Sequence, residues 1–266
     1  MTGPVLLIAA LLAADQPPPA STGPPDNNGG DVAEEPQGGA GVTPIEIVPR
    51  LELRHSFQRL QNGVALHETT TEMDIQFVQR LLLRLQIPYR TLETPAGQVS
   101  GPGDIQLGIL AIVDSSAKYL VALLGGIVLD SATQPVLGTG KQQPYVGGGA
   151  AIKLARWILA YGVVQEQWSV GGDSSRPKIN QLTGDLGAVV FGRQYNWLKV
   201  DLFPTVSFPG GASGQLSGLL EAGSLLIGRV GLFVRVGTQL AGDRQLDYSV
   251  AGGIRYLFRL SKGKTL

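Results

Sequence analysis

The stretch that decides the fold is Leu246–Leu260, which reads LDYSVAGGIRYLFRL. Apolar side chains occupy every second position, and the charged ones fall between them. Ile254 and Tyr256 share one face, whereas Asp247 and Arg255 share the other. Because successive side chains of a β-strand point to opposite faces, this alternation predicts a strand with one apolar and one charged face.

The same period of two continues through most of the chain. Three further clear strands are expected at 50–57, 72–77 and 81–90, and no stretch between Ile45 and Leu260 keeps a helical period. Eight weaker segments of the same kind lie at 103–113, 118–129, 144–154, 156–168, 181–191, 197–208, 215–227 and 230–240. The total is about twelve strands, of a length that suits tilted strands crossing a membrane, which need about nine to eleven residues.

The expected connections alternate between short and long. Tight turns are predicted at Val78–Arg80, Asp114–Ala117, Ala155–Arg156, Gly192–Asn196 and Gly228–Val230. Longer polar loops are predicted at 58–66, 90–102, 130–143, 169–180, 209–214 and 241–245. Short turns at one end and longer loops at the other are typical of outer-membrane barrels. The sequence therefore predicts an all-β fold, an antiparallel up-and-down transmembrane β-barrel of about 12 strands.

The charges of the expected strands fall mainly on the face opposite the apolar one. A soluble sandwich would turn that face to water, and alternation alone leaves this alternative open. In a barrel the charged face lines the lumen, as a structural network or as a filter for passing solutes. The candidate lumen residues are Arg50, Glu52, Arg54, Glu72, Asp74, Arg84, Asp104, Lys199, Asp201, Glu221, Arg235, Arg255 and Arg259. Lys153, Glu166, Asp185 and Asp247 are assigned to the same face.

Composition excludes several classes of function. Charged residues make up 16% of the chain, below the roughly 25% of soluble domains. The formal net charge is zero, so no overall field attracts nucleic acid. The chain has no cysteine, which excludes disulfides, thiolate metal sites and cysteine nucleophiles. We expect no cofactor and no metal.

The amino-terminal part differs from the rest. Residues 1–14 contain the apolar run PVLLIAALLAA and are predicted to be a secretory signal peptide, although no Lys or Arg precedes the run. Residues 15–44 are rich in Pro and Gly and are predicted to be a disordered linker, with a plug inside the pore as the alternative. The barrel is expected over 45–260, followed by a tail at 261–266.

Four aromatic residues are expected near the end with the short turns. They are Trp157, Trp197, Tyr256 and Phe258. Aromatic side chains gather at membrane–water interfaces. The sequence therefore predicts an outward-facing girdle from these four residues, with packing in a soluble core as the alternative.

The stretch Val78–Leu110 reads VQRLLLRLQIPYRTLETPAGQVSGPGDIQLGIL. It resembles the MetA-pathway of phenol degradation family through Leu85–Tyr89 and the glycine-rich strand start Gly101–Gly108. The resemblance implies an outer-membrane barrel of a Gram-negative bacterium that passes small hydrophobic or aromatic compounds. The partners it implies are outer-membrane lipid, the barrel-assembly machinery and a small hydrophobic solute, without nucleic acid.

The two histidines, His55 and His67, are the remaining candidates for chemistry. His55 is followed by Ser56, but neighbouring residues on a strand point to opposite faces and cannot form a catalytic pair. We therefore expect a barrel that is not an enzyme, most simply a narrow pore or carrier. A structural or adhesive barrel without transport is the second interpretation, and a lipid hydrolase at the rim is the third.

Overall fold

The computed structural model describes residues 41–192, 196–227, 229–243 and 245–258. Contacts divide the chain into Met1–Gln37 and Gly38–Leu266, and all described residues belong to the second unit. The predicted signal peptide, most of the predicted linker, Arg259 and the tail lie outside the described residues. Within the described residues, no helix is long and apolar enough to cross a membrane.

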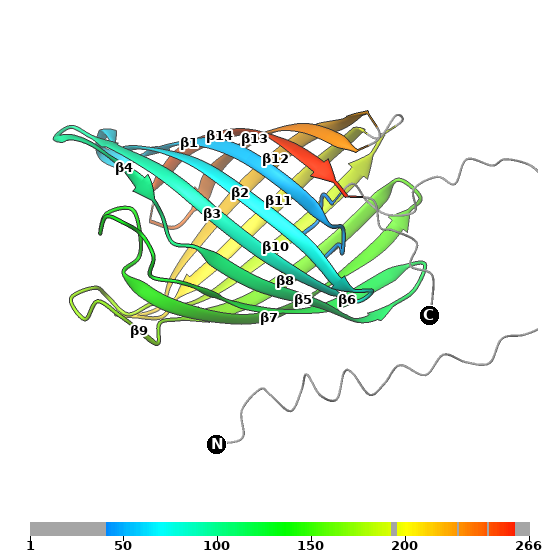
Figure 1. Cartoon of the computed structure of the whole chain (residues 1–266), viewed down its shortest axis with the longest axis horizontal. Helices are drawn as coiled ribbons and strands as arrows, with labels where there is room; N and C mark the ends of the chain where they lie inside the picture. Colours follow the sequence, from blue (N-terminus) through cyan, green and yellow to red (C-terminus); the bar gives the residue numbers. More distant parts are fainter. Residues whose placement is uncertain (1–40, 193–195, 228, 244, 259–266) are drawn as a thin grey trace, which may run out of the picture. The chain divides into compact units, whose positions relative to one another are not determined.

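The described part of the chain is built from antiparallel strands. They are β1 (Arg50–Leu60), β2 (Ala65–Val78), β3 (Leu81–Thr94), β4 (Gly97–Pro102), β5 (Gln106–Ser115), β6 (Tyr119–Val128), β7 (Lys141–Ala155), β8 (Ile158–Trp168), β9 (Gly171–Gly172), β10 (Asn180–Phe191), β11 (Asn196–Ser207), β12 (Ser213–Ile227), β13 (Val230–Ala241) and β14 (Leu246–Leu257). A short 3-10 turn, η1 (Gln61–Gly63), joins β1 to β2. Figure 1 shows the strands as long tilted neighbours.

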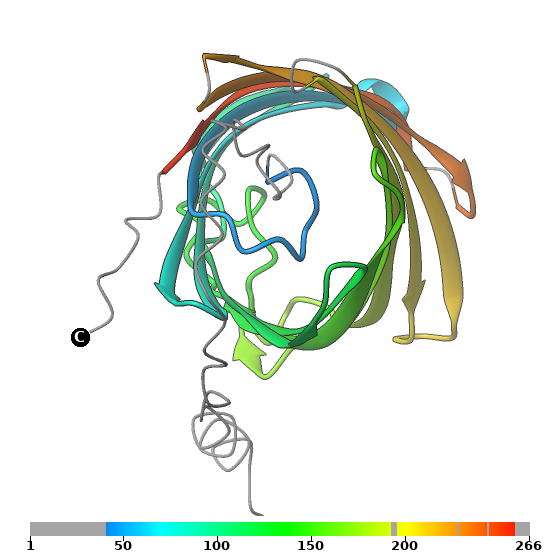
Figure 2. The same cartoon turned by 90° about the vertical axis from the view of Figure 1, so that its right-hand side faces the viewer.

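Twelve of these strands form a closed ring. Each pairs with the next along the chain, apart from β4 and β9, and β14 pairs back onto β1. The short strand β4 pairs only with β3, and β9 pairs only with β7. Figure 2 looks into the resulting barrel. The predicted fold class, an antiparallel barrel of about 12 strands, is confirmed.

Register at the closing seam fixes which side chains face inward. Glu52 lies opposite Arg255, and Leu53 lies opposite Ile254. Glu52 and Arg255 are buried inside the ring, whereas Leu53 and Ile254 are half exposed on its outer wall. Apolar residues continue around that wall on every long strand of the ring. Such an apolar exterior is costly in water and suits the hydrocarbon of a bilayer.

Connections follow the predicted alternation, with two differences. The strands β1 and β2 run on through most of the predicted loop 58–66, so that only residues 61–64 connect them. The predicted loop 90–102 is a hairpin in which β3 continues and pairs with β4. Its turn closes because Thr94 Oγ1 accepts a hydrogen bond from the Ala96 N–H and Gly97 takes a positive φ.

The predicted aromatic girdle is wrong at Trp197. Tyr256 and Phe258 are exposed on the outer wall and Trp157 is exposed in the turn between β7 and β8, but Trp197 is only 3% exposed and lies inside the barrel. Its indole Nε1 donates a hydrogen bond of 2.7 Å to Glu221 Oε1. The ring fits there because Gly223, which lies opposite Trp197 on β12, has no side chain to occupy the space.

The predicted facing is also wrong at Glu166. This residue lies opposite Val146 on β7 and Leu182 on β10, and all three side chains are exposed. Glu166 is therefore on the outer wall, near the end of β8 that meets the long loop. A charge close to the rim costs little compared with one at mid-depth.

Residues 41–49 fold back into the inner end of the barrel, the end with the short turns (Figure 2, blue). Val42, Thr43 and Ile45 are each at most 3% exposed, and the two apolar ones pack in the same cluster as Leu82 and Phe233. The last residues of the segment predicted as linker, 41–44, thus belong to this packed element, because Val42 supplies apolar surface to bury.

Candidate functional site

A belt of paired charges crosses the lumen wall, beginning on β1, β2 and β3. Arg50 Nη2 lies 2.5 Å from Glu72 Oε1, and Arg50 Nε lies 3.1 Å from Asp74 Oδ2. Arg84 donates two hydrogen bonds to the same Asp74, from Nε to Oδ1 and from Nη2 to Oδ2, each 2.8 Å long. Glu72 and Asp74 are almost fully buried, so these charges depend on one another rather than on water.

The belt continues across the closing seam to β14, β13 and β12. Glu52 Oε2 accepts from Arg255 at 2.9 Å, and Arg54 Nη1 lies 3.1 Å from Glu52 Oε1. Arg235 bridges onward, with Nη2 3.7 Å from Glu52 Oε1 and Nε 2.5 Å from Glu221 Oε2. The wall is therefore neutralised pair by pair over half of the ring.

The belt ends on β11 and β8. Lys199 Nζ lies 2.8 Å from Asp201 Oδ2, and the Tyr161 hydroxyl donates a hydrogen bond to Asp201 Oδ1. Eleven of the predicted lumen residues thus lie in one belt: Arg50, Glu52, Arg54, Glu72, Asp74, Arg84, Lys199, Asp201, Glu221, Arg235 and Arg255. Arg259 lies outside the described residues.

Asp104, the remaining predicted lumen residue, has a different position. It lies between β4 and β5 and is 7% exposed. Its carboxylate accepts from the Thr139 N–H at 2.6 Å, the Thr139 hydroxyl at 2.9 Å, and the N–H groups of Ser131 and Ala132 at 3.3 and 3.2 Å. Asp104 therefore holds the loop 129–140 at the end of the barrel with the long loops, which we call the outer end.

That loop is held from a second side. Arg90 Nη1 donates to the Leu137 carbonyl at 2.9 Å, and Leu137 is 1% exposed. Arg90 Nε also pairs with Glu68 Oε2 at 2.6 Å. The loop is thus tied to β3 and to the bend before β5, above the charged belt.

A polar chamber of about 210 Å³ lies between this loop and the belt. We call it the outer chamber; its lining is Arg54, Glu68, Thr70, Gln86, Pro88, Arg90, Asp104, Gln106, Val128, Thr139, Gln143 and Gln167. Its four glutamines were not predicted as lumen residues, because they carry no charge. Their place on the inward face of four alternating strands was the signal that could have found them.

The inner end of the lumen contains residues 41–49, whose Val42 and Ile45 join an apolar cluster. Glu46 Oε2 accepts from the N–H groups of Val42 and Thr43 at 2.8 and 3.3 Å, which folds the segment into a turn. Arg50 Nη1 donates to the Gly41 carbonyl. Burial raises the pKa of Glu46 above its usual range, against the opposing effect of those two N–H groups and of the Arg50 and Arg255 charges.

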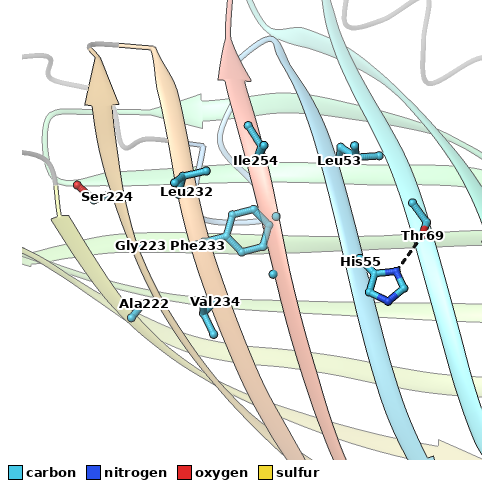
Figure 3. A pocket seen from close by; sticks show the side chains of 12 residues that line it. Leu53, His55, Thr69, Ala222, Gly223, Ser224, Leu232, Phe233, Val234 and Ile254 are labelled. Carbon is cyan, nitrogen blue, oxygen red and sulfur yellow. Dashed lines mark hydrogen bonds between the residues drawn. The ribbon is translucent and has the colours of Figure 1, made fainter.

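The histidines lie outside the barrel. His55 Nδ1 is 3.0 Å from Thr69 Oγ1, and the rings of His55 and His67 are 5.9 Å apart between centroids. Ser56 points the other way and contacts the Glu68 carbonyl. Within the described residues, no hydrogen bond joins a serine to either histidine. Figure 3 shows His55 and Thr69 in a shallow groove of the outer wall, beside Leu53 and Ile254.

The fold is similar to that of several solved outer-membrane proteins. No family model matches the chain, and no curated protein sequence matches it either. The COG4313 outer membrane channel from Pseudomonas putida F1 is similar in structure, with a TM-score of 0.64 and 14% identity over 88% of this chain and 100% of that one. The NanC porin gives a TM-score of 0.59 at 8% identity, over 79% of this chain and 100% of the porin. The KdgM porin gives a TM-score of 0.54 at 9% identity, over 79% of this chain and 99% of the porin.

The fold and the apolar wall define the class of protein: a β-barrel of the type found in outer-membrane channels and porins. The MetA-pathway family suggested by residues 78–110 stays a prediction, because no family model matches.

Proposed function

We propose that this protein is a narrow pore for small solutes in the outer membrane of a Gram-negative bacterium. The observation that carries the proposal is the outer chamber, a polar cavity inside a closed barrel whose exterior is apolar. An exterior of this kind suits lipid, whereas a polar cavity suits a passing solute.

The lumen contents support a narrow rather than a wide passage. Large side chains of the belt, among them Arg50, Arg235 and Arg255, extend inward from the wall. The inner end contains residues 41–49 in addition. A barrel of twelve strands lies between those that side chains fill and those that leave an aqueous channel.

Passage of small hydrophobic or aromatic compounds is a second candidate. The observation that favours it is the apolar cluster at the inner end, which includes Leu82, Leu110, Trp197 and Phe233. An aromatic ring bound in that cluster would lie close to the Trp197 indole. Such compounds should therefore change the tryptophan fluorescence of the wild-type protein but not that of Trp197→Phe.

The proposal is tested by reconstituting the purified full chain in planar bilayers and liposomes. We expect discrete ion-conductance steps and uptake of small solutes, with protein-free and heat-denatured samples as controls. A correctly folded barrel that conducts no ions and admits no solute would instead support the structural or adhesive interpretation. Release of fatty acid from the lipids would support a hydrolase.

A further inference from the structure

The charges around the outer chamber are satisfied within the protein. Arg90 pairs with Glu68, and Arg54 lies 3.1 Å from Glu52. Asp104 accepts four hydrogen bonds from the loop 129–140 and so presents no free carboxylate. A charged solute entering this space would lose hydration without meeting a counter-charge that is available to it.

Uncharged polar groups of the outer chamber form a chain of hydrogen bonds that begins at Gln181, outside the chamber lining. Gln181 Nε2 donates to Gln167 Oε1 at 3.3 Å, and Gln167 Nε2 donates to Gln143 Oε1 at 2.5 Å. Gln143 Nε2 then donates to Thr139 Oγ1 at 2.5 Å, whose hydroxyl donates to Asp104. This chain fixes the orientation of amides contributed by three strands, β7, β8 and β10.

The strands β3 and β5 carry two more oriented amides. Gln86 Nε2 donates to Glu72 Oε2 at 2.7 Å, and Gln106 Nε2 donates to the Tyr145 hydroxyl at 3.1 Å. Since an amide has two N–H donors and a carbonyl acceptor, these two residues keep both a donor and an acceptor for a solute. Pro88 and Val128 add a small apolar surface between the amides.

We infer that the outer chamber binds a neutral, hydroxyl-rich solute of the size of a polyol or a single sugar ring. Hydroxyl groups both donate and accept, as the amides do, and the C–H faces of such a molecule can contact Pro88 and Val128. An apolar solute would leave the amides desolvated without partners, at a cost of about 1–3 kcal/mol for each group. The volume, about 210 Å³, corresponds to about seven water molecules at about 30 Å³ each.

This inference rests on the proposed pore, and the experiment separates the two. The ion current of the full-length protein in planar bilayers is measured with increasing sorbitol, with gluconate as a charged molecule of similar size, and with benzyl alcohol as an aromatic one. We expect sorbitol to reduce the current saturably beyond its effect on solution conductivity, and the other two to show no saturation. A saturable effect of gluconate or benzyl alcohol alone, or of none of the three, overturns the inference while leaving the pore intact. Absence of any current overturns the pore itself.

Variants locate the effect. We expect Gln86→Met with Gln106→Met, which keeps side-chain volume but removes the two amides that keep a donor and an acceptor for a solute, to raise the half-saturating sorbitol concentration at least tenfold. The control Gln98→Met changes an exposed amide on β4, outside the chamber, and should leave that concentration unchanged. Equal shifts in both proteins, or none in the double variant, would overturn the assignment to the outer chamber. If the double variant fails to fold, the comparison of the three solutes on the wild-type protein still tests whether the pore binds a neutral, hydroxyl-rich solute.

Discussion

At the scale of single residues, Asp74 shows how the lumen keeps its charges. The carboxylate is 1% exposed and is shared between Arg50 and Arg84, with three contacts of 2.8 to 3.1 Å. If the Asp74 carboxylate were removed, bulk water could not easily solvate the parts of Arg50 and Arg84 that now face it. The belt is therefore a coupled set in which the loss of one member affects two others.

We predict that Asp74→Ala destabilises the barrel strongly. Removing one partner of a buried pair costs about 3–5 kcal/mol, whereas replacing both partners with apolar residues is often much milder. The measurement is the free energy of unfolding in denaturant for the protein in lipid vesicles. The double variant Asp74→Leu with Arg84→Met is the control and should lose less. A loss below about 1 kcal/mol for Asp74→Ala would be that of a solvated surface pair and would show a water-filled lumen.

A second prediction at this scale concerns the two faces of β14. Ile254 is 52% exposed on the outer wall, and Ser249 lies on the opposite, inward face. We expect Ile254→Arg to impair assembly, because an arginine that faces lipid costs up to about 2–4 kcal/mol, depending on its depth. Ser249→Arg should assemble normally. Folding yields in lipid vesicles measure the difference, and equal yields would contradict the facing.

Single residues also mark where sequence patterns stop being informative. Alternation placed eleven charges on the inward face, because a β-strand has only two faces to choose between. The same parity puts Trp197 inside, yet its aromatic character suggested the interface. Gly223 leaves room for the Trp197 indole inside the barrel. This contact depends on the register between β11 and β12, which the sequence does not reveal.

At the scale of elements, residues 41–49 differ most from expectation. Residues 41–44 were predicted to be the end of a linker, with a plug as the alternative, and residues 45–49 to be the start of the barrel; Val42 and Ile45 are too few to produce a periodic pattern. Only a cavity already lined with Leu82, Trp197 and Phe233 makes their burial favourable. The hairpin of β3 and β4 was missed because the apolar alternation stops after Tyr89, and only the pair Leu92 and Val99 is apolar beyond it.

We predict that residues 41–49 are held more firmly at acidic pH. The pKa of Glu46 is raised above its usual 4.5, so folding of the segment takes up a proton. Its stability is then fully present below the usual pKa and decreases as the pH rises through the window above it. Burial is the main cause, opposed by the Val42 and Thr43 N–H groups and by the Arg50 and Arg255 charges.

Thiol labelling measures this effect, because the chain has no cysteine of its own. Thr43→Cys should react faster as the pH rises, relative to Ser174→Cys in an exposed loop, which corrects for ionisation of the thiol. Adding Glu46→Gln should remove the extra pH dependence. If the ratio of the two rates stays constant with pH in the Glu46 protein, the segment is not controlled by this carboxyl group.

At the scale of the whole molecule, the strand positions and the closed ring could be predicted from the sequence, since lipid demands apolar residues at every second position. The outer chamber could not be predicted, because it arises from glutamines on strands far apart in the chain.

For the intact protein we predict that it is recovered in the outer-membrane fraction of the cell. Unboiled samples should migrate on a gel as a compact band that boiling converts to a slower one. Recovery as a soluble periplasmic monomer would contradict the membrane barrel.

The seam between β1 and β14 has a consequence for the time course of folding. The bond from Arg255 to Glu52 joins residues 203 positions apart, so it depends on β14, the last strand of the ring in chain order. Contacts of such high sequence separation form slowly, because the entropy of closing the loop is lost before they contribute. Until β14 arrives, β1 and β13 keep open edges that can pair with other chains. A chain truncated before Leu246 should therefore aggregate or be degraded rather than accumulate as a smaller barrel.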